Sequence, residues 1–185
     1  WQQALGAPLG IDSIDWQAFG PTTNYMIARG ARSDLRDYGA VLHLLLNEGL
    51  AGSGRRLLSR DSVFELWRDR IGALPVIDPP PTAEPPVRYG LGSWFAPQRP
   101  AGRPPLIHSL GAFGFMPWVD FEAGLFGVFM LRGLPGINTR LLPEYEALLV
   151  ELRAAAGAPG CVEFERFDAV FSDTFEGSGP PILLP

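Results

Sequence analysis

Three segments of the chain carry hydrophobic residues at the spacing of an amphipathic helix. Ser33 stands before the first segment and Ser59 before the second, in the position where a serine side chain caps a helix. Glycines follow the last apolar residues of both segments and indicate where these helices end. The predicted helices span residues 34–48, 60–71 and either 138–156 or 143–156.

Between the second and third helices the pattern changes to short apolar and aromatic runs, which are typical of β-strands. The last two runs are separated only by residues 121–123, so they predict an antiparallel hairpin. Pro117 lies inside the first of them and indicates a bulge or an edge strand, because proline has no N–H to donate. The predicted strands span residues 88–95, 106–109, 113–120 and 124–132.

The remaining segments show neither the hydrophobic spacing of a helix nor the pattern of a strand. Residues 1–30 contain four glycines, two prolines and one asparagine, which favour turns, and predict mostly loop. Residues 75–105 hold ten of the 19 prolines, which predicts irregular chain around the first strand. Residues 157–185 contain five acids but also four phenylalanines, so we expect an extension packed on a domain formed by residues 1–156.

The order of elements, with two helices before the strands and one after them, predicts an α+β fold with an antiparallel sheet and flanking helices. We expect one face of this small sheet to lie under a helix, and the other face and one edge to stay open. On this reading the domain is incomplete without an N-terminal piece.

Composition narrows the function classes. The 185 residues suffice for one domain, and the 15 basic residues, all arginine, against 20 acids give a net charge of −5, which argues against nucleic-acid binding. No apolar run is long enough for a membrane helix. The single cysteine, Cys161, excludes an internal disulfide and a cysteine zinc cluster. The chain begins at Trp1 and shows no signal-peptide pattern, so we predict no compartment.

The most distinctive chemistry lies at residues 108–114, where a predicted strand ends in His108 and Ser109 and a glycine-rich turn follows. Glycine lets a ligand approach the backbone, and N–H groups in such a turn can point at an oxyanion. The pattern fits equally a glycine-rich bend beside a surface histidine, and the local sequence leaves both interpretations open.

Other reactive residues fit structural roles better. His43 lies among leucines of the first predicted helix and is expected to pack there. Cys161 precedes an acidic stretch, and nearby acids disfavour a thiolate. Two histidines and one cysteine, far apart in sequence, are too few for a metal site, so we expect no metal and no other cofactor. A metal or thiol enzyme that uses His43, His108 and Cys161 is a third, weaker hypothesis.

Five stretches in order along the chain resemble the C-terminal part of the serine β-lactamase-like hydrolases, a family that includes class C β-lactamases, family VIII carboxylesterases and D-aminopeptidases. They cover the chain from about residue 5 to residue 155. The matching stretches are Ala-Pro-Leu-Gly-Ile at 7–11, the charged helix start and Leu-Leu-Leu-Asn-Glu-Gly at 32–49, Arg-Leu-Leu-Ser at 56–59, Tyr-Gly-Leu-Gly-Ser-Trp at 89–94, and the strand and hairpin at 108–128.

The resemblance implies a site at the family's third motif, which reads Lys-Thr-Gly or His-x-Gly on a strand. Here it implies His108 and Ser109 as catalytic residues, with Leu110 or Gly111 in the third place. A backbone N–H from Leu110, Gly111 or Ala112 would then complete the oxyanion hole.

The rest of the family's machinery is missing from the chain. The chain has no lysine, so it contains no Ser-x-x-Lys nucleophile motif, and none of its tyrosines begins a Tyr-x-Asn motif. The resemblance therefore implies a hydrolase of a small-molecule ester or amide that acts only when an N-terminal fragment of the same protein supplies the nucleophile. The alternative is a non-catalytic binding module with the same fold.

Overall fold

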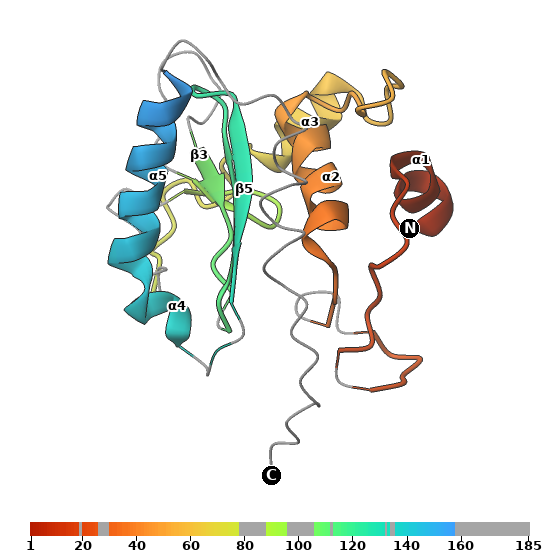
Figure 1. Cartoon of the computed structure of the whole chain (residues 1–185), viewed down its shortest axis with the longest axis horizontal. Helices are drawn as coiled ribbons and strands as arrows, with labels where there is room; N and C mark the ends of the chain where they lie inside the picture. Colours follow the sequence, from red (N-terminus) through yellow and green to blue (C-terminus); the bar gives the residue numbers. More distant parts are fainter. Residues whose placement is uncertain are drawn as a thin grey trace.

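Five strands form one antiparallel sheet and follow each other in chain order across it (Figure 1). The structure is a computed structural model that describes residues 1–18, 20–25, 30–77, 88–95, 106–111, 113–131, 133 and 136–157. The expected extension at 158–185 lies outside these residues, as does most of the proline-rich segment. The strands are β1 (Arg88–Tyr89), β2 (Trp94–Phe95), β3 (Leu106–His108), β4 (Phe115–Asp120) and β5 (Leu125–Met130).

The hairpin predicted at 113–132 is confirmed by β4 and β5, which pair along their full length. The single strand predicted at 88–95 is wrong, because this segment folds back on itself as the short hairpin of β1 and β2. Gly92 has a φ of 93°, a left-handed conformation that glycine adopts without strain. The Gly90 N–H donates to the Ser93 carbonyl at 3.0 Å and closes this turn.

Pro117 lies inside the sheet, opposite Val128 of β5, and not at an edge or a bulge as predicted. Its carbonyl accepts the Ser109 N–H at 3.1 Å, but it has no N–H to return the second bond of that pair. The ladder between β3 and β4 therefore ends at His108, whose partner is Trp118.

Helices α2 (Leu35–Leu46) and α3 (Arg60–Leu66) form where the periodicity predicts them. Ser59 caps α3 as predicted, whereas the cap of α2 is Asp34 and not Ser33. Helix α3 ends at Leu66, well before the predicted glycine. The Leu66 carbonyl accepts the Leu91 N–H at 2.8 Å, so the β1–β2 turn takes the bond that a further helical turn would need.

The predicted C-terminal helix is confirmed and consists of a short α4 (Ile137–Arg140) followed by α5 (Leu142–Ala156). Pro143 lies in the first turn of α5, where its missing N–H has no intrahelical partner to lose. None of the helices in the described part of the chain has the length and apolar character that crossing a membrane would require.

The N-terminal segment is mostly loop, as its turn formers predict, except near its start. It begins with a π-helical turn, η1 (Gln2–Gly6), and a single helical turn, α1 (Ala7–Leu9). It is held to α2 by Asp37, a buried helix residue whose carboxylate accepts the Asp12 and Ser13 N–H groups at 2.9 and 2.7 Å. Burial alone would raise the pKa of Asp37, but these hydrogen bonds outweigh it and lower the pKa.

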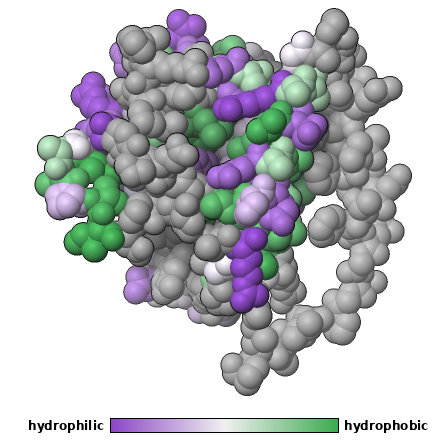
Figure 2. Space-filling view, turned by 90° about the vertical axis from the view of Figure 1, so that its left-hand side faces the viewer, coloured by the Kyte–Doolittle hydropathy of each residue, from purple (hydrophilic) through white to green (hydrophobic). Residues whose placement is uncertain are grey.

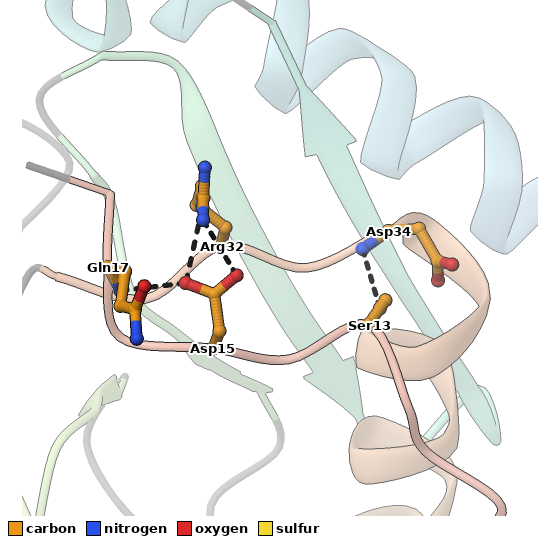
Figure 3. A network of polar contacts seen from close by, with 5 residues as sticks. All are labelled: Ser13, Asp15, Gln17, Arg32 and Asp34. Carbon is orange, nitrogen blue, oxygen red and sulfur yellow. Dashed lines mark hydrogen bonds and ion pairs between the residues drawn. The ribbon is translucent and has the colours of Figure 1, made fainter. Parts of the chain in front are cut away.

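After α1 the N-terminal segment forms a loop, and polar residues join the two stretches of chain at its base (Figure 3). Asp15 and Arg32 exchange two backbone hydrogen bonds, and their side chains form an exposed ion pair at 2.9 Å. Ser13 accepts the Asp34 N–H at 3.1 Å beside this pair, so the loop leaves and rejoins the fold at one point.

Both faces of the sheet are covered, so the expected open face is wrong (Figure 1). On one face α2 and α3 pack against the sheet through a cluster that includes Leu42, Val63 and Trp67. On the other face α5 packs against it through Tyr145 and Leu149. The edges fit the expectation better: among the described residues, neither β1 nor β5 pairs with a further strand on its outer side.

Candidate functional site

The strand pairing arranges the residues around His108 in two rows that cross the sheet. In an antiparallel sheet, residues directly opposite each other point to the same face, and neighbours along a strand point to opposite faces. One row contains Tyr89, Trp94, His108, Trp118 and Gly127. The next contains Arg88, Phe95, Ile107, Val119 and Phe126.

The row of His108 faces α5. Trp118 belongs to the α5 cluster, and Leu106 and Leu110, two places before and after His108, pack against the same cluster. The Nδ1 atom of His108 is buried and has no hydrogen-bond partner among the described residues. Burial lowers the pKa of His108 to about 4, so the imidazole is neutral near pH 7.

Ser109 follows the other alternation, with Ile107, and faces α2 and α3. Alternation therefore turns the two predicted catalytic side chains to opposite faces of the sheet, although both residues contribute to the lining of one cavity. Adjacent in sequence, they lie on opposite faces of the sheet at the end of β3.

A cavity of about 110 Å³ opens at this end of β3. Helix α2 contributes Tyr38, Leu42 and Leu45 to its lining, and the end of α3 contributes Leu66 and Trp67. The β1–β2 turn and the facing parts of β3 and β4 complete it, Ser109 and Pro117 included, and His108 also contributes to the wall. Burial raises the pKa of the Tyr38 hydroxyl, so this group is neutral as well.

The turn after Ser109 narrows the choice of oxyanion donor. The Gly111 N–H donates to the Phe115 carbonyl at 2.7 Å, so the turn itself already uses it. A Cβ on Gly111 would lie 2.8 Å from that oxygen, which explains the glycine. The Leu110 N–H makes no backbone hydrogen bond to the other described residues, and by alternation it points away from β4. Ala112 lies outside the described residues.

The other candidate residues, His43 and Cys161, are not placed in a catalytic site by the described structure. His43 is half-buried on α2, with its ring edge-on to Phe126 at 5.9 Å, and burial lowers its pKa. Cys161 lies outside the described residues. Within the described ranges no three His, Cys, Asp or Glu side chains come close enough to hold a metal ion.

The sequence reading missed the most deeply buried charge of the sheet. Asp120 ends β4 at 1 % exposure and accepts the Glu122 and Ala123 N–H groups at 3.0 Å each. Its second oxygen pairs with Arg153 of α5. An acid just before a hairpin turn could have predicted the hydrogen bonds to the turn. Nothing in the local sequence predicts the pairing with Arg153, which lies 33 residues away. This group fixes α5 on the sheet and does not line the cavity beside Ser109.

No family model matches the chain, and no curated protein matches it significantly. Several solved structures, however, have a similar fold. One is a protein of Bacteroides dorei DSM 17855 named only as a candidate β-lactamase, with 24 % identity and a TM-score of 0.63 over 81 % of this chain. Another is the unliganded simvastatin synthase LovD from Aspergillus terreus, with 19 % identity and a TM-score of 0.56 over 83 % of this chain.

The matches cover 50 % and 48 % of those two proteins, so the chain spans about half the length of each. At these identities the likeness concerns the fold. The antiparallel sheet with helices on both faces confirms the expected architecture, and the chain has part of a β-lactamase-like fold.

Proposed function

We propose that the chain is the C-terminal part of a serine hydrolase that cleaves an ester or amide through an acyl-enzyme. The observation that carries the proposal is the end of β3, where Ser109 lies beside a cavity and the Leu110 N–H is unpaired within the described backbone. Similarity to a candidate β-lactamase and to an enzyme of the same fold supports it.

The spacing of the third motif agrees with Ser109 rather than His108 as its first residue. In Lys-Thr-Gly the glycine comes two places after the lysine. Gly111 comes two places after Ser109 and three after His108. Alternation along β3 supports the same assignment, because it turns the Ser109 side chain toward the face where the cavity lies. We therefore assign Ser109-Leu110-Gly111 to the motif and give His108 a packing role on the α5 face.

In the proposed reaction a serine from an N-terminal segment attacks the substrate carbonyl and loses its proton to that segment's lysine or tyrosine. The Leu110 N–H stabilises the oxyanion together with the N–H of the nucleophile. The leaving alkoxide or amine takes up the proton, and water then releases the acyl group as an acid. The described chain supplies the oxyanion donor and the cavity wall.

We propose that the N-terminal segment binds along the outer edge of β5. All six β5 residues are only partly buried, and no described strand pairs with the outer side of β5. A strand added there would extend the sheet.

The test is to produce the chain together with a polypeptide that carries Ser-x-x-Lys, encoded directly before it, and to react the complex with a fluorophosphonate probe. We expect labelling of the N-terminal polypeptide and turnover of p-nitrophenyl acetate. Ser109→Ala should lower kcat/KM about tenfold, while the exposed Ser53→Ala should leave it unchanged.

His108→Ala sharpens the assignment, because a catalytic His108 would lower kcat at unchanged stability. The packing role given to it here predicts the reverse, a stability loss with kcat retained. If no chain of the complex is labelled, the proposal fails and a binding module without a nucleophile takes its place, in keeping with the absence of lysine from this chain.

A further inference from the structure

Helix α5 leaves apolar residues exposed beside those that pack on the sheet. Tyr145 and Leu149 are buried, whereas Leu148 and Leu152 are 38 % and 37 % exposed in the described fold. Ala155 is exposed as well and continues the line of the two leucines, because positions i, i+4 and i+7 share one side of a helix. Leu148, Leu152 and Ala155 thus form an apolar stripe along one flank of α5.

The sequence that follows α5 has the spacing of a second amphipathic helix. Four phenylalanines recur at intervals of three or four residues, namely Phe164, Phe167, Phe171 and Phe175. A helix would place all four on one side, which we call the phenylalanine face. Gly177 follows the last of them, in the position where glycine often ends a helix. The pattern predicts a helix over residues 162–176.

The length of the connection determines where this helix can pack. Only residues 157–161 separate the end of α5 from the predicted helix, and they include Pro159 and Gly160, which favour a turn. Two helices joined by so few residues lie antiparallel beside each other. A phenylalanine face of this size is unfavourable in water, so it needs an apolar surface to cover it. The nearest such surface is the apolar stripe of α5.

The two apolar patterns match in antiparallel register. Counted backward from the connection, the residues of the apolar stripe are separated by three and then four positions. Counted forward from the connection, the first three phenylalanines are separated by the same three and four positions. The pairs that would meet are Phe164 with Ala155, Phe167 with Leu152, and Phe171 with Leu148.

We propose that residues 162–176 form a helix that folds back along α5 and covers the apolar stripe with its phenylalanine face. Both helices carry more acids than arginines, three against one in α5 and five against one in residues 162–176, so apolar contact has to hold them together. The inference is independent of the proposed function, because the apolar stripe belongs to the α5 side of the sheet and Ser109 faces the other side.

The first experiment measures how fast a thiol on the apolar stripe reacts with dithionitrobenzoate in the full chain. The lone cysteine is removed by Cys161→Ser, the probe is Leu148→Cys, and Val150→Cys on the same helix is the matched control. In the described fold Leu148 and Val150 are 38 % and 64 % exposed, which differ by less than a factor of two. We expect the thiol at position 148 to react at least tenfold more slowly, because the second helix covers it.

Variants of the phenylalanine face test what provides this protection. Phe167→Asp together with Phe171→Asp should bring the reaction rate at position 148 to within about threefold of the rate at position 150, because charged side chains do not pack on an apolar stripe. Ala169→Asp is the control. It adds the same charge two residues from each of them, on the opposite side of the predicted helix, and should leave the protection intact.

A second experiment tests the register and keeps most of the phenylalanine face. Leu148→Cys with Phe171→Cys, again with Cys161→Ser, should form a disulfide within one chain under oxidised glutathione, because the register brings the two positions together. Val150→Cys with Phe171→Cys is the control, since position 150 points away from the stripe. We expect the first pair to close at least tenfold faster, as measured by intact mass after alkylation of the remaining thiols.

Equal reaction rates at positions 148 and 150 in the full chain would overturn the inference, and so would equal closure of the two cysteine pairs. Protection at position 148 that survives Phe167→Asp with Phe171→Asp would also overturn it. A disulfide between two chains would then identify a second copy as the cover. Protection that arises only when the N-terminal polypeptide is added would identify that polypeptide instead. None of these outcomes involves Ser109, so the proposed hydrolase stands or falls separately.

Discussion

The two faces of the sheet differ in what they bury. On the α2 and α3 face the core is hydrocarbon and aromatic, and it leaves a cavity beside Ser109. On the α5 face the core includes polar groups, namely the Asp120 carboxylate, the His108 imidazole and the Tyr145 hydroxyl. The cavity beside Ser109 thus lies on the apolar face.

This difference bears on the proposed site, because a ligand needs space as well as polar groups. The buried core of the α5 face includes Trp118, Met116 and Tyr145. Trp118 lies so close over Gly127 that a Cβ there would be 2.7 Å from its ring. The α2 and α3 face carries few reactive side chains but offers a wall that a ligand can contact.

The outer side of α5 supports the view of this helix as a cover. Figure 2, which looks onto this side of the molecule, shows hydrophobic and hydrophilic side chains interspersed. Leu148 and Val150 are 38 % and 64 % exposed, while Tyr145 and Leu149 on the inner side are buried. The helix thus turns its best-packed positions toward the sheet.

The largest effect expected from this comparison follows removal of the Asp120 carboxylate. Asp120→Ala leaves two turn N–H groups and Arg153 without their acceptor, and we expect a loss of about 3 kcal/mol in the free energy of unfolding. Urea denaturation measures this loss. The control is Glu146→Ala, which removes an exposed acid of α5 and should change the free energy of unfolding by no more than about 0.5 kcal/mol. Equal behaviour of the two variants would mean that α5 is held by apolar contacts alone.

An intermediate effect is expected from pH through His108. Its pKa is about 4 in the folded protein and 6.5 in the unfolded chain, so between these values the unfolded chain binds the extra proton. Stability should therefore fall as the pH falls from 6.5 to 4, by on the order of 2 kcal/mol from this group.

Urea denaturation at pH 7 and pH 4.5 tests the effect, with His108→Phe as the reference that removes this titration but keeps an aromatic ring in the row. We expect a flatter pH dependence in the variant. The same slope in both proteins would show that His108 is solvated and that the α5 face is not closed around it.

We expect the smallest effect on stability from the exposed Asp15–Arg32 ion pair at the base of the N-terminal loop, which packs on neither face of the sheet. Arg32→Ala removes an ion pair whose side chains are 59 % and 41 % exposed, so the urea midpoint should not change measurably. The hydrogen bond from Arg32 is the main cause that lowers the pKa of Asp15, so this pKa should rise toward its ordinary value. A carboxyl NMR titration reports the shift, and a clear drop in the urea midpoint would contradict the comparison.

Local signals in the sequence predicted most elements. Ser59 marked the start of α3, and the apolar alternation around residues 121–123 marked the β4–β5 hairpin. These features depend on groups a few residues apart, so the sequence holds the whole cause. The predicted end of α3 failed because a distant partner intervened, since the Leu91 N–H takes the carbonyl that ends the helix. The strand predicted at 88–95 failed for a local reason, because a tight turn inside it pairs β2 with β1.

The candidate site shows the same division. The sequence by itself indicated residues 108–114 as the candidate site and determined that the chain holds no lysine for the nucleophile motif. Only the tertiary structure decided that His108 and Ser109 face different helices, that the Gly111 N–H is used by its own turn, and that the free space lies beside Ser109. The physical reason is that alternation along a strand is local, whereas the cavity beside Ser109 is formed with helices far away in the chain.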